Sequence, residues 1–139
     1  MAERLRGNEL VALIKRVFQP GEADKSLAIL VDLPDAKVAD NPDWTTRRSI
    51  AEGWLQELTD CERESGIKPV LVLYRNAHTN NGNLPERCWI YRGNGLPKVA
   101  EELDLADSIP FEELFDTYPL MLAPTQFSAT APLKMAAKR

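Results

Sequence analysis

One stretch decides the fold: Ser26-Leu27-Ala28-Ile29-Leu30-Val31-Asp32-Leu33-Pro34. Its apolar residues follow one another without a break and then run into an Asp and a Pro. An unbroken apolar run is typical of a strand buried on both faces, as in a parallel sheet covered by helices on each side. A second run of this kind, Pro69-Val70-Leu71-Val72-Leu73-Tyr74, follows a segment long enough for a helix. The sequence therefore predicts a strand-helix-strand unit with parallel strands.

The segment between the two strands has the apolar spacing of a helix. It is expected to start near Asp43 or Thr45 and to end at Gly66. Its apolar stripe consists of Ile50, Trp54, Leu58 and Cys61, widened by Ala51 and Leu55. An earlier amphipathic helix, from a cap at Asn8 to Pro20, carries apolar residues between Leu10 and Phe18. Packing against the sheet is favoured for it over a membrane surface, because it has few basic residues and one aromatic anchor.

The second half of the chain predicts shorter elements. Strands are expected over 88–91 and 119–123, a helix or turn over 98–105, a helix over 108–115 capped by Ser108, and a last helix after 125. Together these elements indicate an α/β fold. The expected architecture is a small three-layer Rossmann-like or flavodoxin-like domain with a mostly parallel sheet flanked by helices.

Length and charge limit the function classes. The chain has 139 residues, about one ordinary domain at ~100–200 residues each, so residues 1–139 are expected to form a single domain. Its net charge of −4 argues against nucleic acid as a partner, because a phosphate-binding protein needs a basic face. No uncharged leader segment or long apolar span occurs, so no membrane association is expected. Cys61 and Cys88 are too far apart for a paired motif and indicate reduced thiols in a cytoplasmic protein.

Polar side chains gather after the predicted strands. In an open parallel sheet, ligands bind outside the carboxyl ends of the strands. That edge is expected to bring together a small set of candidate ligand-binding residues from three separate segments. They are Asp32 and Asp35, then Asn76, His78 and Asn81, then Ser128 and Thr130.

Four of these candidates also have a structural interpretation that is favoured over the functional one. Asp32 is suited to bind a ribose, a metal or an amine, but capping of the loop from Pro34 to Asp40 is the favoured interpretation, because Asp is common in turns. His78 is the one histidine and supplies too few ligands for zinc, so an exposed loop residue is the simpler interpretation. Ser128 and Thr130 lie where a helix start could receive an anion, yet every helix start needs a cap.

Motifs that would identify a catalytic or metal site do not occur. The sequence has no Gly-rich nucleotide loop, and no nucleophile stands at motif spacing from His78. The adjacent acid pairs Glu101-Glu102 and Glu112-Glu113 point about a hundred degrees apart on a helix, so neither forms a catalytic dyad. We therefore assign no catalytic residue and no metal ligand, and the cofactor stays unknown.

Three stretches resemble a known family. They are Ala28-Ile-Leu-Val-Asp-Leu-Pro34, Asn80-Asn-Gly-Asn-Leu-Pro85 and Leu122-Ala-Pro-Thr-Gln-Phe-Ser-Ala-Thr-Ala-Pro-Leu133. In layout the chain is similar to the N-terminal α/β domain of aminopeptidase T-like leucyl aminopeptidases. That family holds its metal in a second domain, so no catalytic residue transfers to this sequence. The resemblance implies a domain that frames a substrate cleft or a subunit contact.

Two functions remain open. One is this non-catalytic, metallopeptidase-related domain. The other is a stand-alone α/β protein that binds a small anionic or polar molecule. Partners are expected to be a small molecule or a protein, with self-association into a homo-oligomer as an option. An autonomous hydrolase is least favoured, because no nucleophile and base are recognisable.

Overall fold

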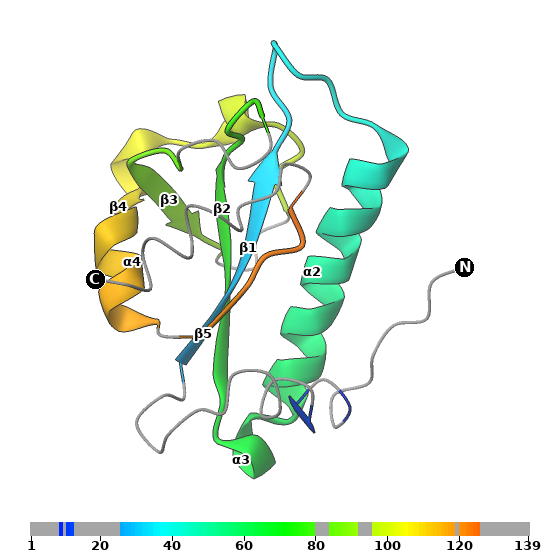
Figure 1. Ribbon diagram of the computed structural model, residues 1–139, viewed down its shortest axis with the longest axis vertical. Helices are drawn as coiled ribbons and strands as arrows, with labels where there is room; N and C mark the ends of the chain where they lie inside the picture. The colour runs from blue at the N-terminus through cyan, green and yellow to red at the C-terminus, as the bar shows by residue number, and fades with distance from the viewer. Residues whose placement is uncertain are drawn as a thin grey trace.

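The protein contains one mixed β-sheet with helices on both faces (Figure 1). The computed structural model describes residues 9, 11–12, 26–79, 84–91, 96–118 and 120–125. Within these ranges the sheet has five strands in the order β4-β3-β2-β1-β5. The strands are β1 (Ser26–Leu33), β2 (Lys68–Arg75), β3 (Arg87–Ile90), β4 (Ile109–Pro110) and β5 (Leu120–Leu122). The helices are α2 (Pro42–Asp60), α3 (Glu62–Ser65) and α4 (Phe111–Thr117), with 3₁₀ turns η1 (Ala100–Glu102) and η2 (Leu105–Asp107).

Strand β1 is an interior strand of the sheet with a neighbour on each side, next to the middle strand β2. It pairs in parallel with β2 on one side and with β5 on the other. All residues from Leu27 to Leu33 are buried. Because side chains alternate along a strand, Leu27 and Ile29 face α2 while Ala28 and Leu30 face α4. The unbroken apolar run is thus explained by two buried faces.

The prediction of a mostly parallel sheet is wrong. Strand β3 is antiparallel to β2, and β4 is antiparallel to β3. A parallel return from β2 would need a long crossover, usually a helix, whereas only a short connection separates Arg75 from Arg87. Three layers with helices on both faces are present, but half of the strand pairings are antiparallel.

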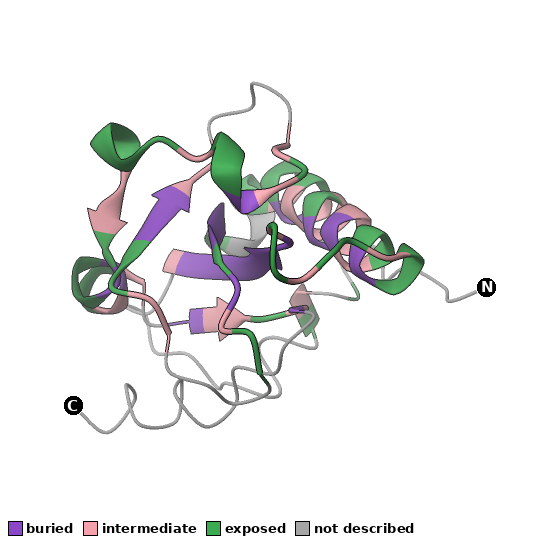
Figure 2. Ribbon diagram, turned by 90° about the horizontal axis from the view of Figure 1, so that it is seen from above, coloured by how far each residue is buried: buried purple, intermediate pink, exposed green. Residues whose placement is uncertain are grey.

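Helix α2 covers one face of β1 and β2. Asn41 caps it by accepting a hydrogen bond from the Trp44 amide at 2.8 Å, and Pro42 occupies the first turn, where its missing N–H costs nothing. Its buried side chains are Trp44, Arg48, Ala51 and Leu58. The helix begins at Pro42, slightly earlier than expected. The short helix α3 follows it and ends at Gly66, which has a left-handed conformation with φ 75°. Figure 2 shows the buried strip of α2 turned toward the sheet and the exposed strip turned away.

Helix α4 covers the opposite face. Phe111 and Leu114 pack there with Leu30, Val72 and Tyr74. The Phe111 ring meets the Tyr74 ring edge to face at 5.3 Å. Ser108 is not the cap of this helix, because Pro110 occupies that position and the Ser108 hydroxyl donates to the Leu105 carbonyl instead. Ile109 and Pro110 form the short strand β4 directly before this helix.

Several expectations fall partly or wholly outside the described residues. Glu9, Val11 and Ala12 are helical, and the rest of the predicted first helix is not described. The predicted last helix, after residue 125, is also outside the described part. No helix within the described ranges is long and apolar enough to cross a membrane. Cys61 and Cys88 are both free thiols.

Candidate functional site

The carboxyl ends of β2, β1 and β5 lie next to one another, which makes this edge of the sheet the candidate site. The register sets Asp32 opposite Tyr74 and Leu33 opposite Arg75. The chain then leaves β1 into a loop over 34–41, which we call the rim loop, and leaves β2 into the segment that carries Asn76 and His78. The sequence prediction that these two segments meet is confirmed by direct hydrogen bonds between them.

Asp35, Asn76 and His78 form one connected group, here called the Asp35 cluster. The Asp35 Oδ2 atom lies 2.8 Å from His78 Nε2 and accepts a hydrogen bond from Asn76 Nδ2 at 3.2 Å. Its Oδ1 atom accepts from the amides of Lys37 and Val38 at 2.9 and 2.8 Å. Both carboxylate oxygens are therefore occupied by donors from the same chain, which is the arrangement of a loop organiser.

Asn76 joins three segments through one amide group. Its Nδ2 atom donates to the Leu33 carbonyl at 2.8 Å as well as to Asp35, and its Oδ1 atom accepts from the His78 amide at 2.9 Å. The side chain is almost fully buried. An amide suits this position because it supplies two donors and an acceptor, whereas a carboxylate supplies acceptors alone.

His78 has a left-handed backbone conformation with φ 64°. Such a conformation is uncommon outside glycine, although His, Asn and Asp adopt it more readily than most residues. The hydrogen bond from its amide to Asn76 stabilises the turn. The imidazole itself is 45% exposed, and because Asp35 occupies Nε2, only Nδ1 remains for a ligand.

The Asp35 carboxylate is held in its ionised form. Partial burial opposes ionisation, but the hydrogen bond with His78 and the bonds from the Val38 and Lys37 amides outweigh it and lower the pKa of Asp35 below its usual value. A nearby ion pair lowers the pKa of a second carboxyl group of the rim loop in the same way. Arg48 binds the Asp40 carboxylate at 3.0 and 2.6 Å and lowers the pKa of Asp40.

A second group, the Asp32 cluster, lies inside the sheet edge on the α4 side. It consists of Asp32, Tyr74 and Thr125, which are 0%, 1% and 4% exposed. Alternation along β1 places Asp32 on the same face as Ala28 and Leu30, and its register partner Tyr74 packs on that face. The Tyr74 hydroxyl is hydrogen-bonded to the Thr125 side chain. Arg47 of α2 donates to the Thr125 carbonyl at 2.8 Å. Thr125 therefore contacts both Tyr74 of β2 and helix α2.

Neither buried nucleophile in this region is suited to react at neutral pH. Burial and the neighbouring Asp32 charge raise the pKa of Tyr74, although the Thr125 hydrogen bond opposes the shift. Burial raises the pKa of the Cys88 thiol to about 12. A thiol with such a pKa carries almost no thiolate at neutral pH, and the thiolate is the reactive form.

The structure thus separates residues that the sequence grouped together. Asp35, Asn76 and His78 are in mutual contact, whereas Asp32 is buried on the α4 side of β1. Asn81, Ser128 and Thr130 lie outside the described residues. Within the ranges that are described, no three His, Cys, Asp or Glu side chains gather closely enough to hold a metal ion.

Three residues of this edge were not predicted. Glu101 of η1 accepts a hydrogen bond from the Ala36 amide at 3.1 Å. The two residues are far apart in sequence, and nothing near either of them predicts this contact. Trp44 donates from its indole Nε1 to the Asp32 carbonyl at 2.8 Å. Tyr74 could have been recognised, because it is the one polar aromatic residue at the end of the second apolar run.

Comparison of the chain with protein-family models, with curated proteins and with solved structures returns no match. The fold is that of a small mixed α/β domain. Because none of these comparisons gives a match, a function has to be argued from the geometry of the carboxyl edge of the sheet.

Proposed function

We propose that the chain is a non-catalytic α/β domain whose carboxyl-edge loops frame a substrate cleft or a subunit contact. In this role it would correspond to the N-terminal domain of aminopeptidase T-like metallopeptidases, which its sequence resembles. One observation carries the proposal. The most exposed candidate carboxylate, Asp35, has both oxygens occupied by donors of its own chain.

This occupancy favours a supporting role over a chemical one. A general base or metal ligand needs a lone pair directed at the substrate or ion. The four hydrogen bonds to Asp35 direct its lone pairs at the rim loop and the end of β2 instead. The high pKa of Cys88 supports the same conclusion, because it removes a candidate nucleophile from neutral-pH chemistry.

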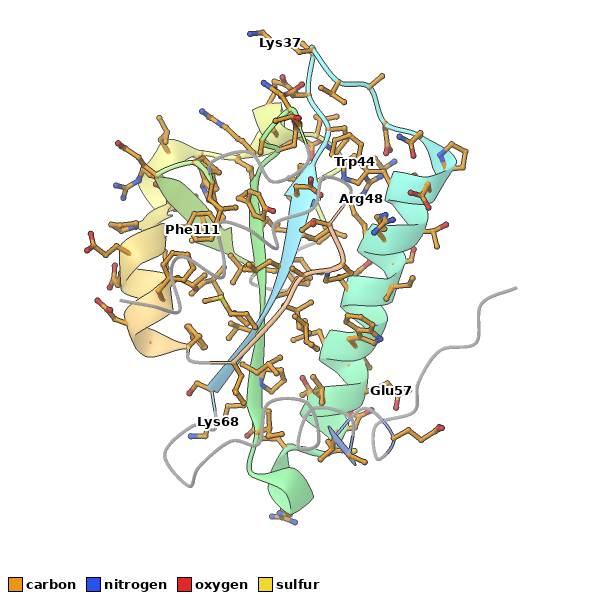
Figure 3. All side chains as sticks on the ribbon, in the orientation of Figure 1. Lys37, Trp44, Arg48, Glu57, Lys68 and Phe111 are labelled. Atoms are coloured by element: carbon orange, nitrogen blue, oxygen red, sulfur yellow. The ribbon has the colours of Figure 1, made fainter. Side chains whose placement is uncertain are left out.

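The rim loop supplies the surface that would make the contact. Its tip carries the exposed residues Ala36 and Lys37, and Lys37 lies at the far end of the molecule beyond β1 (Figure 3). A loop whose backbone is already fixed loses little conformational entropy when a partner binds it. Free Cys61 and Cys88 support a reducing, cytoplasmic location for this interaction.

The test combines mass, assembly and activity. Native mass spectrometry of the endogenous protein is expected to show a species heavier than the 15.6 kDa chain, either as a longer polypeptide or as an assembly. Lys37→Glu is expected to weaken a subunit contact, while Gln56→Ala, on the exposed side of α2, leaves it unchanged. An endogenous monomer of 15.6 kDa contradicts both the cleft and the contact. Hydrolysis of aminoacyl p-nitroanilides by the purified chain with Zn²⁺, Co²⁺ or Mn²⁺ contradicts the non-catalytic role.

A second candidate function is favoured by the exposed imidazole of His78. With Nε2 fixed by Asp35, its Nδ1 has a defined direction and can bind a polar or anionic molecule. A thermal-shift screen of nucleotides, sugar phosphates and amino acids tests this, because ligand at about 100 times Kd adds ~2.7 kcal/mol of stability. The ligand shift should disappear in His78→Asn and persist in Gln56→Ala. No shift with any compound would remove this candidate.

A further inference from the structure

The rim loop is fixed by hydrogen bonds that reach three neighbouring parts of the fold. It runs from buried Pro34 to Asn41, the cap of α2. At its base, the Pro34 carbonyl accepts from the Ala100 amide of η1 at 2.7 Å. Beyond that base, the side chains that accept the hydrogen bonds holding the loop are all carboxylates. They belong to Asp35 and Asp40 in the loop and to Glu101 on η1.

Asp35 is the hub of these bonds. One of its oxygens closes the turn by accepting the Lys37 and Val38 amides. The other oxygen binds His78 and Asn76, which belong to the segment after β2. The same carboxylate therefore shapes the loop and ties it to the neighbouring strand.

The two other carboxylates act at separate points. Glu101 of η1 accepts from the Ala36 amide, directly beside the exposed tip. Asp40 lies at the far end of the loop, where the nearly buried guanidinium of Arg48 binds it. Hydrogen bonds to ionised groups are roughly twice as strong as neutral ones, so the hold on the loop depends on charge.

We propose that the rim loop is a strap fastened by carboxylates: it keeps one conformation while Asp35 is ionised, and acid frees it while the sheet stays folded. The strap depends on the bonds within the loop and to its neighbours, so it stands or fails independently of what the carboxyl edge binds.

The charges around Asp35 determine the direction of the effect. His78 faces it from the segment after β2, and Glu101 of η1 binds the Ala36 amide of the loop. Lys37 and Asp40 belong to the loop itself. Arg48 of α2 is paired with Asp40. The pKa of Asp35 is lower in the folded protein than its ordinary value of 3.8. The strap is therefore fully fastened above that value and is lost as the pH falls through the lower, folded pKa.

Amide hydrogen exchange of Lys37 and Val38, read by NMR and corrected for intrinsic rates, measures the strap directly. Asp35→Ala removes the acceptor and should lower the protection of both amides about tenfold, equivalent to ~1.4 kcal/mol. Asp35→Asn keeps an acceptor for the turn but sets an amide donor against Asn76, so its protection should be intermediate. Asp43→Asn, which breaks an exposed ion pair with Arg47 outside the loop, is the matched control and should leave protection within about twofold of wild type.

Acid supplies the second arm of the experiment. As the pH falls below 3.8 toward the lower, folded pKa of Asp35, wild-type Lys37 and Val38 should lose protection while Ile29 and Leu71, in the buried strands, retain it. In Asp35→Asn the same two loop amides should respond less to pH than in wild type, because only Asp40 and Glu101 then remain as the ionisable acceptors that hold the loop. The strap is overturned if Asp35→Ala protects Lys37 and Val38 as well as wild type does, or if strand and loop amides lose protection together in acid.

Discussion

Substitution of Asn76 by Asp is the sharpest test of the site geometry. Asp has almost the same shape as Asn but no donor, so it sets a carboxylate at 2.8 Å from the Leu33 carbonyl and 3.2 Å from Asp35 Oδ2, where an amide now donates. Two unit charges ~4 Å apart repel by about 4 kcal/mol at the effective dielectric constant of a protein surface. We expect Asn76→Asp to be strongly destabilising at pH 7.

Asn76→Ala separates the loss of hydrogen bonds from the added charge. It leaves the buried Leu33 carbonyl without this donor, which costs ~1–3 kcal/mol, and it removes the acceptor of the His78 amide at ~1 kcal/mol. The expected total is therefore ~2–4 kcal/mol, with Asn76→Asp larger by ~2 kcal/mol or more at pH 7. Urea denaturation followed by circular dichroism measures both values.

The pH dependence distinguishes the two variants. Two carboxylates in contact raise the pKa of one of them in the folded state. A raised folded pKa means that the native state binds more protons, so the stability of Asn76→Asp should rise as the pH falls from 7 to 5, by at most ~1.4 kcal/mol per pH unit. Wild-type Asp35 stays ionised over this range because its pKa is lowered.

Asn41→Asp is the matched control for Asn76→Asp. The Asn41 side chain accepts a hydrogen bond from the Trp44 amide, and Asp caps a helix as well as Asn does. This control should change stability by less than ~0.5 kcal/mol. The described bonding of Asn76 is refuted if Asn76→Asp is as stable as wild type at pH 7, or if Asn41→Asp loses as much stability as Asn76→Asp.

Three further outcomes follow from buried or charged contacts. Trp44→Phe removes the indole N–H that donates to a buried main-chain carbonyl and should cost ~2 kcal/mol in urea denaturation, and a cost near zero would contradict that bond. Leu114→Ala empties a fully buried position under α4 and should cost ~2–5 kcal/mol, compared with a negligible change for Glu113→Ala on the exposed side. Asp35 and Asp40 have lowered folded pKa values, so their contribution to stability should be complete above about pH 5 and fall as the pH drops below ~4, which urea titrations at pH 7, 5 and 3.5 can measure.

The elements that were predicted correctly have strong local signals. Strand β1 and strand β2 are continuous apolar runs, and α2 between them has helical apolar spacing with Asn41-Pro42 at its start. Parallel pairing of β1 with β2 follows from the helical crossover between them. From these elements alone, the sequence also places Asp35 and His78 at one edge of the sheet, where the structure shows them in contact.

The direction of β3 had no local signal. Its residues predict a strand, but a strand pairs in either direction, and the outcome depends on a connection rich in turn formers. Glu101 is a similar case. Nothing near it in sequence indicates that its carboxylate binds the Ala36 amide, because that contact exists only after η1 packs beside the rim loop.

The sequence by itself determined that the segment from Ser26 to Leu33 is a buried interior strand of an α/β fold, since an apolar run of this kind has to be covered on both faces. It could not distinguish the roles of Asp32 and Asp35, which are both acids at the end of that strand. The tertiary structure decided this. Alternation along β1 turns Asp32 into the α4 side beside Tyr74, whereas Asp35, beyond the strand, is free to meet Asn76 and His78 in the rim loop.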